Sequence, residues 1–517
     1  METWFLILST ICITTILTLL IIPKKTSKTQ RLPPGPFTVP ILGNFLWLRK
    51  SSSERERMLR NLHAGYGPIL TLRLGSRPTI IVTNRVLAHK ALVQNGAVFA
   101  DRPPALLTTK TFTSNQHNVN SSFYDPTWRI LRRNLTSEIL HDSRVKSYTR
   151  ARKWVLDFLI NRLISHSTTE SGNVKPVVVV DHFRYAMVCL LVLMCFGDKL
   201  RETQINEIED VHRHLLLRAE GFNVLNFWPW LGKIIFRKRW KEFYDIFEAR
   251  KAVLMPLIEA RKRAKQERLS KARENEEEEF VVSYVDTLLD LELPEEKRKL
   301  EEGEMVSLCS EFINAGTDTT ATALQWIMAN LVKYPHVRER VLGEIKGVVV
   351  GDGEKEVKEE DLNKLGYLKA VVLEGLRRHP PSRFVLPHAV TEDVVLEGYL
   401  VPKNATLNFL VADMGWDPKV WEDPMEFKPE RFMIGGGGGK VVDITGSKEI
   451  KMMPFGVGRR ICPGAGLAML HLEYFVANLV WNFDWKAVEG DEVDLSEKQE
   501  FTVVMKYPLK AHLSPRF

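Results

Sequence analysis

One cysteine near the C-terminus stands in a setting that suits metal chemistry. The stretch Phe455-Gly-Val-Gly-Arg-Arg-Ile-Cys462-Pro-Gly464 places Cys462 in a loop of small residues, followed by a run of helix-forming residues. A single cysteine cannot build a zinc or iron–sulfur site, because those sites take several ligands at short spacing. It can be the one axial thiolate of a haem, since N–H groups at the start of a helix stabilise negative charge on sulfur. The alternative is a free cysteine packed beside a glycine-rich turn.

A second stretch interrupts a helical pattern with polar residues. Apolar residues recur every three or four positions over Met305–Tyr334, which predicts a helix, yet Ala315-Gly-Thr-Asp-Thr-Thr320 lies inside it. Glycine and threonine lower helix propensity and a buried Asp costs desolvation, and such local conflict marks functional positions. Gly316 would leave room for a ligand, Thr319 could donate to bound dioxygen, and Asp318 could relay protons. The alternative is a kinked core helix whose Thr hydroxyls bond their own carbonyls.

The propionates of a haem need cationic partners, and one pair of residues has a suitable spacing. Trp128 and Arg132 are four residues apart, so they face the same side of a helix. The planar fork of arginine can bind two carboxylate oxygens at once. The same spacing also suits ordinary cation–π packing.

Together these motifs resemble the cytochrome P-450 superfamily of haem-thiolate monooxygenases. The resemblance rests on three motifs: Phe-x-x-Gly-x-Arg-x-Cys-x-Gly, the pattern around Asp318-Thr319, and Trp-x-x-x-Arg. The resemblance implies a mostly α fold with a smaller β-rich lobe, and heme b with the thiolate of Cys462 as its axial ligand. The other residues that it implies for cofactor binding are Trp128, Arg132, His388, Phe455, Arg460 and Gly464.

Three further residues are assigned to stability rather than to chemistry. Glu374 and Arg377 are three residues apart, and Arg431 follows in Pro429-Glu-Arg-Phe432. They are similar to the structural Glu-Arg-Arg triad of the family, which implies a role in fold stability and in positioning the cysteine loop. Taken alone, the Glu374–Arg377 spacing is that of an ordinary surface salt bridge.

The N-terminus predicts a membrane anchor. Trp4–Ile22 carries no charge and approaches the roughly 20 residues that a helix needs to cross a bilayer. Basic residues and Leu32-Pro-Pro-Gly-Pro36 follow, which by the positive-inside rule keeps the rest cytosolic. We expect an anchor over 1–23, a basic, Pro-rich hinge over 24–36 and a single domain over 37–517. The resemblance implies a single-pass protein of the endoplasmic reticulum membrane.

The net charge of the chain and the motifs that it lacks indicate which macromolecules it binds. The chain has 517 residues and a net charge of +8, but no zinc-finger, RNP or basic-zipper pattern, so we expect no nucleic-acid partner. Its five cysteines show no paired spacing, which argues against a disulfide framework. No G-x-G-x-x-G opens a βαβ unit, so electrons must come from another protein. The resemblance implies an NADPH-dependent cytochrome P-450 reductase.

Three segments have local predictions. Ile69–Leu74 and Thr79–Val82 are typical of a β-hairpin. The polar, turn-rich segment 103–125 is typical of a long loop, and the resemblance implies that this loop lies over the haem. In 222–240, aromatic residues mix with basic ones, which suits a second contact with the membrane interface. The alternative for 222–240 is a partly buried helix pair.

The function expected from all this is insertion of one atom of O2 into a lipophilic plant metabolite. The stretches 141–144, 190–198 and 451–456 resemble the plant family numbered eighty-nine. Two rivals are a haem-thiolate isomerase or dehydratase that needs neither O2 nor reductase, and a non-catalytic haem-binding protein. Arg383 is an unusual charge in the expected pocket and could meet a substrate carboxylate, solvent or a propionate.

Overall fold

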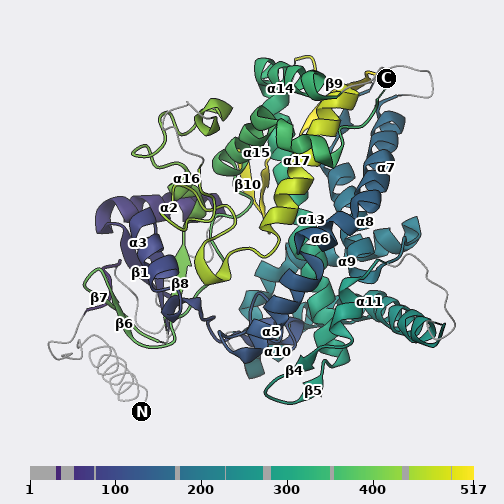
Figure 1. Ribbon diagram of the computed structural model, residues 1–517. Coiled ribbons are helices and arrows are strands. Elements are labelled where there is room, and N and C mark those ends of the chain that lie inside the picture. Colours follow the sequence, from purple (N-terminus) through teal and green to yellow (C-terminus); the bar gives the residue numbers. More distant parts are fainter. Residues whose placement is uncertain are drawn as a thin grey trace, which may run out of the picture. The chain divides into compact units, whose positions relative to one another are not determined.

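We describe the chain from a computed structural model (Figure 1). It forms two compact units, Met1–Pro103 with Pro387–Leu410 and Pro104–Leu386 with Val411–Phe517. The structure describes residues 31–36, 52–74, 77–168, 175–226, 229–271, 281–349, 354–403, 405–433, 442–490 and 492–517.

The smaller unit is built on a short sheet. Strands β1 (Ile69–Leu74) and β2 (Arg77–Val82) pair antiparallel, with Ile69 opposite Val82. This pairing confirms the predicted hairpin. Strand β8 (Thr406–Phe409) then adds parallel to β2, although it lies far along the chain. The other elements of this unit are α2 (Ser52–Tyr66), α3 (Arg85–His89), η2 (Lys90–Gln94), η3 (Val98–Ala100), β6 (Val394–Leu396) and β7 (Tyr399–Val401).

The larger unit is helical and centres on α13 (Glu302–Lys333), which covers the predicted helix 305–334. Helix α8 (Val180–Phe196) packs along it. Nearly every residue of α8 is apolar and buried, as expected of a helix surrounded by other helices. Helix α17 (Ala465–Asn482), which follows Cys462, also packs on α13 (Figure 1).

The remaining elements of the larger unit surround this core. The longer helices are α7 (Thr149–Ser167), α9 (Glu202–Arg218), α11 (Arg237–Lys271), α14 (Pro335–Val348) and α15 (Gly366–Arg378). The short helices are α4 (Leu107–Phe112), α5 (Pro126–Asn134), η4 (Leu135–Ile139), α6 (Asp142–Ser147), η5 (Ala219–Asn226), α10 (Pro229–Ile235), α12 (Tyr284–Leu288), η7 (Glu359–Lys364), α16 (Val411–Gly415), η8 (Pro429–Phe432) and η9 (Gly458–Arg460).

Small antiparallel sheets complete the larger unit. Strand β12 (Lys510–Pro515) pairs with both β3 (Val177–Val178) and β9 (Phe483–Ala487). Strand β10 (Glu497–Gln499) pairs with β11 (Val503–Met505), and β4 (Glu292–Leu293) with β5 (Arg298–Lys299). The expectation of a mostly α fold with minor β structure is therefore confirmed.

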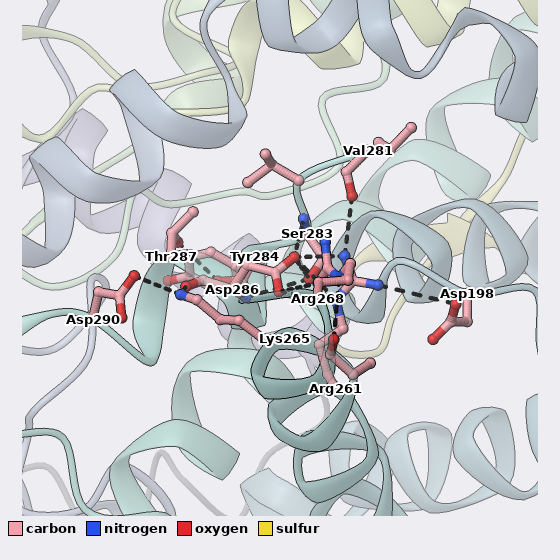
Figure 2. Close-up of polar contacts among 12 residues, drawn as sticks. Asp198, Arg261, Lys265, Arg268, Val281, Ser283, Tyr284, Asp286, Thr287 and Asp290 are labelled. Atoms are coloured by element: carbon pink, nitrogen blue, oxygen red, sulfur yellow. Dashed lines mark hydrogen bonds and ion pairs between the residues drawn. The ribbon is translucent and has the colours of Figure 1, made fainter. Parts of the chain in front are cut away.

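A buried ion pair ties α11 to α12. Figure 2 shows Arg261 and Lys265 of α11 converging on the loop that starts α12. Arg261 donates to Asp286 at 2.6 Å (Nη2 to Oδ2), and the hydroxyl of Ser283 donates to the same oxygen at 2.8 Å. Burial alone would raise the pKa of Asp286, but these hydrogen bonds hold it below its ordinary value. The ion pair therefore holds α11 against the start of α12.

One local expectation was wrong in part. The segment 103–125, predicted as a loop, contains the helix α4. The Phe112 ring at its end packs edge-on against Phe243 and Phe247 of α11, with ring centroids 4.9 and 5.9 Å apart. Such a long-range contact can order a turn-rich segment that local propensity leaves as loop.

The predicted anchor over 1–23 and most of the hinge over 24–36 lie outside the described residues. Among the helices that the structure does describe, none is long and apolar enough to cross a membrane.

Candidate active site

The loop that carries Cys462 is held by its own backbone. The N–H of Cys462 donates to the carbonyl of Phe455 at 2.8 Å, so the two ends of the loop meet. Gly456 and Gly458 have φ of 67° and 73°, which is the left-handed region that favours glycine. Gly464 then caps the start of α17. The loop thus presents the cysteine just before a helix N-terminus, as the sequence indicated.

The electrostatics of Cys462 are those of a ligand position rather than of a free nucleophile. Its side chain is exposed, yet protein surrounds it closely enough for burial to raise the pKa of the thiol. A hydrogen bond from the N–H of Gly464 and the charge of Arg132 oppose that rise. A coordinated metal ion deprotonates a thiol outright. Gly464 and Arg132 therefore favour the thiolate and burial outweighs them, so deprotonation of Cys462 depends on a bound metal.

Three predicted cofactor-binding side chains meet beside this loop. Arg132 of α5 donates to the carbonyl of Ile461 at 2.7 Å (Nη2 to O), directly next to the cysteine. The Arg460 guanidinium lies 4.2 Å from the ring centre of Trp128. Burial lowers the pKa of Arg132, and the nearby sulfur of Cys462 opposes this. Two cations and an indole ring are thus gathered where anionic groups of a cofactor could bind.

These side chains also fix the segment before α5. The indole N–H of Trp128 donates to the carbonyl of Val119 at 3.1 Å, and Arg460 donates to that of Ser122 at 2.7 Å. On the other side, the Glu311 carboxylate of α13 accepts the N–H groups of Val119 and Asn120 at 2.9 and 2.7 Å. Glu311 was missed from the sequence, because a carboxylate on a helix face gives no local signal of a distant loop.

Helix α13 presents one open face inside the larger unit. Ala315 is exposed and Thr319, one turn later, is partly exposed, whereas Ile313, Thr317 and Asp318 are buried. The Thr319 hydroxyl donates to the Ala315 carbonyl at 2.7 Å, which is the back-bonded arrangement weighed as the alternative. A Cβ at Gly316 would lie 2.7 Å from Leu191 of α8. This close helix contact accounts for the glycine by itself, so its role in making room for a ligand stays a prediction.

Asp318 lies on a different side of α13, in an ion-pair network. It is 1% exposed, and its Oδ1 is 3.1 Å from Arg213 Nη1 and 3.4 Å from Arg184 Nε. The Thr502 hydroxyl donates to its Oδ2 at 2.7 Å. Arg213 also bonds Glu500 at 2.7 Å, which links Asp318 toward the surface of the larger unit. The sequence did not single out these partners, because each comes from another segment.

His388 belongs to the smaller unit. It is 4% exposed, and its backbone pairs with Leu407. Its ring Nδ1 lies 2.7 Å from the carbonyl of Phe99, so Nδ1 carries the proton and donates. Its predicted contact with a haem propionate stays a prediction.

The predicted structural triad is assembled around a fully buried Glu374–Arg377 pair, with Arg431 partly buried beside it. Arg377 donates twice to Glu374, at 2.7 and 2.8 Å, and Arg431 donates to the same carboxylate at 3.2 Å. Both Glu374 and Arg377 are at most 1% exposed. Arg377 also donates to the carbonyls of Gly415 and Pro424, in the irregular region that precedes the cysteine loop. This is not the surface pair that the spacing alone suggested.

Arg383 is already paired. Its guanidinium donates to Glu497 of β10 and lies 5.8 Å from the ring centre of Trp416. A substrate carboxylate that met Arg383 would therefore share the guanidinium with Glu497.

Comparison with known proteins decides the family. The cytochrome P450 family model matches residues 33–514. This chain belongs to the cytochrome P450 family. Cytochrome P450 89A9 of Arabidopsis thaliana is 52% identical over 498 residues, covering 94% of each chain. The isoflavone 2'-hydroxylase of Medicago truncatula is 30% identical, covering 95% of this chain and 93% of the relative. The resemblance to the plant family numbered eighty-nine is thereby confirmed.

A solved structure shares the fold. A zebra fish cytochrome P450 crystallised with abiraterone matches 89% of this chain and 99% of its own, with a TM-score of 0.70 and 22% identity. Membership of the P450 family makes this chain a monooxygenase by class, and its cofactor is a haem with an axial cysteine thiolate.

The local structure fits such a group. The P450 haem needs one thiolate, small residues beside it and cations for its propionates. Cys462 is the accessible thiol, and a Cβ on Gly464 would meet no described atom within 4 Å. Arg132, Arg460 and Trp128 lie around the same loop.

Proposed function

We propose that this chain is a membrane-anchored cytochrome P450 that inserts one atom of O2 into a lipophilic plant metabolite. Its electrons come from NADPH through a separate reductase. The observation that carries the proposal is the gathering of Arg132, Arg460 and Trp128 around an accessible cysteine at a helix start. Its domain organisation is the expected one, with an anchor over 1–23, a hinge over 24–36 and one catalytic domain over 37–517.

The residues of this chain have separate tasks in that reaction. The haem, when bound, supplies the activation of O2 and the transfer of one oxygen atom to the substrate. Cys462 would hold it by its sulfur, Phe455 and Gly464 would shape the loop, and Arg132, Arg460 and Trp128 would face its carboxylates. His388 would donate to them from Nε2 as a doubly protonated ring, since its Nδ1 donates to Phe99. Thr319 and Ala315 line the open face of α13, where the Thr319 hydroxyl can turn from the Ala315 carbonyl to donate to a ligand. Asp318 holds and passes protons.

The lipophilic acceptor is supported by relatives. The isoflavone 2'-hydroxylase and the flavonoid 3'-monooxygenase, at 30% and 29% identity, are named for oxidising ring compounds. We place the protein at the endoplasmic reticulum with its catalytic domain in the cytosol, because of the uncharged stretch Trp4–Ile22 and the basic residues after it.

The test is a reconstitution of the full-length protein with a plant reductase in liposomes. We expect substrate-dependent NADPH oxidation and product that carries one atom of 18O from 18O2. A product formed without O2 or reductase would instead indicate the isomerase or dehydratase. Haem binding with no turnover over a broad panel of plant lipophiles would favour a non-catalytic carrier.

A further inference from the structure

A small, partly open cavity lies beside Asp318, on the side of α13 that faces α8 and α9. Its volume is about 20 Å³, and its lining includes Glu209, Thr317 and Asp318. A cavity of at least roughly 10–15 Å³ holds a water molecule if polar partners line it. The size of this cavity therefore suits one water.

Thr317 supplies an unsatisfied polar group in that lining. It is 6% exposed, and its hydroxyl oxygen is buried without a hydrogen-bond partner in the described part of the chain. Thr319, on the same helix, bonds the carbonyl four residues back, whereas Thr317 does not. A buried hydroxyl without a hydrogen bond lowers the stability of the fold, so we expect a hydrogen-bonding partner for Thr317 in the cavity.

Glu209 faces the cavity from α9. It makes no hydrogen bond or ion pair with any residue that the structure describes. Burial raises the pKa of its carboxyl group, and this rise is only partly offset by nearby arginines, so the protonated form persists to higher pH than in an ordinary glutamate. The charged groups around Glu209 and the cavity are Arg162, Asp181, Arg184, Asp210, Arg213 and Asp318.

His212, which also lines the cavity, is not a proton carrier. Its Nδ1 lies 2.8 Å from the Ile208 carbonyl and its Nε2 lies 3.1 Å from the Ser310 hydroxyl. Nδ1 must donate to the carbonyl, so Nε2 accepts from the hydroxyl. Burial lowers the pKa of His212 to about 4, so the ring stays neutral near pH 7.

We propose that the cavity binds one ordered water that joins Thr317, Glu209 and Asp318, and that Glu209 supplies protons to Asp318 through it. The Glu209 carboxyl group gives a proton to the water, the water gives one to the Asp318 carboxylate, and Glu209 regains a proton from solvent. Glu209 affects the reaction only through Asp318, to which it supplies protons, and touches neither the substrate nor the cofactor. The inference rests on the proposed role of Asp318 in the monooxygenase reaction.

The first test needs no turnover. A crystal structure of the holoenzyme should show a water bonded to the Thr317 hydroxyl and within hydrogen-bond distance of Glu209 and Asp318. Thr317→Val should lose this water.

Thermal unfolding is a further test without turnover. Glu209→Gln should have a higher Tm than the parent near pH 8 and an equal Tm near pH 4. A raised pKa in the folded protein lowers its stability only at pH values where the Glu209 carboxylate is ionised. A dry cavity or equal Tm values at both pH values would overturn the inference.

The second test measures the pH profile of coupling, as product formed per NADPH. Glu209→Gln should lower coupled turnover by roughly tenfold, less than the loss of a direct catalytic acid, because solvent can partly replace it. Glu207→Gln, on the exposed face of the same helix, is the matched control and should behave like the parent.

The two proposals fail differently. If Asp318→Asn uncouples turnover and Glu209→Gln does not, the proton route proposed here is wrong while the role of Asp318 stands. If neither variant changes coupling at any pH, Asp318 carries no protons and both proposals fall.

Discussion

At the scale of single residues, type and spacing singled out the residues around Cys462 but not the ionic partners of Asp318. The structure brings Trp128, Arg132 and Arg460 together near Cys462, as their motifs predicted. It also shows Asp318 held by Arg213, which is 105 positions away in the sequence. Neighbours at helical spacing can be read from a sequence, whereas partners across two helices depend on how those helices pack.

The Arg132 contact gives the first residue-scale prediction. Arg132→Gln should weaken haem retention by roughly tenfold or more, since hydrogen bonds that involve a charged group contribute about 1.5–3 kcal/mol. It should also raise the pKa of the Cys462 thiol, because the cation that opposes the effect of burial is gone. Haem release into an acceptor protein measures the effect. Arg133→Gln, an exposed neighbour, is the control, and equal release from the two variants would contradict the assignment.

The second residue-scale prediction concerns the hydroxyl of Thr319. Thr319→Ala should bind haem as the parent does, because the lost hydrogen bond goes only to the backbone of its own helix. It should divert NADPH electrons to peroxide, since the open face of α13 loses its hydroxyl donor. Thr319→Ser keeps the hydroxyl and should restore coupling. The measurement is the ratio of peroxide to product, and a fully coupled Thr319→Ala enzyme would remove Thr319 from the mechanism.

At the scale of elements, strong periodicity predicted the structure and weak local signals did not. The helix expected over 305–334 is α13, Glu302–Lys333, since apolar residues recur at helical spacing on both sides of the polar interruption at 315–320. The loop expected over 103–125 contains α4, which depends on the distant partner Phe243. Likewise, the spacing of Glu374 and Arg377 suggested a surface salt bridge. The pair is buried because α15 packs against η8, a contact that the spacing does not predict.

That buried triad predicts a large stability effect. Glu374→Gln leaves two arginines without their carboxylate in the interior, which should cost about 3–5 kcal/mol of unfolding free energy. The variant should also lose haem more readily, because Arg377 holds the backbone before the cysteine loop. Chemical denaturation measures the first effect. Asp245→Asn, in the exposed Lys241–Asp245 pair, is the control and should change stability little; a similarly small effect of Glu374→Gln would contradict the role given to the triad.

At the scale of the whole molecule, the fold class was implied by the family that the motifs resemble, but the pairing of remote segments needed the structure. Strand β8 joins β2 across more than 300 residues, and β12 joins β3 in the same way. Short strands such as these carry little pattern of their own, and their partners are set by where the helices between them pack.

Membrane association also belongs to this scale. Ile234 and Ile235 at the end of α10 are 67% and 60% exposed, and basic residues follow them at 237–239. Exposed aliphatic side chains beside lysine and arginine favour the lipid interface. In a chain that lacks the anchor, Ile234→Ser with Ile235→Ser should therefore weaken binding to anionic liposomes several-fold. Met425→Ser, another exposed apolar position, is the control. Unchanged sedimentation of the double variant with liposomes would exclude this second contact.

The most direct test of the central claim is a carbon monoxide difference spectrum of the reduced, full-length protein in membranes. Ligation by the Cys462 thiolate predicts the red-shifted Soret band of a haem-thiolate protein, and Cys462→Ala should lose that band. A band of the histidine or thiol type in well-folded parent protein would contradict thiolate ligation and the oxygen chemistry that depends on it.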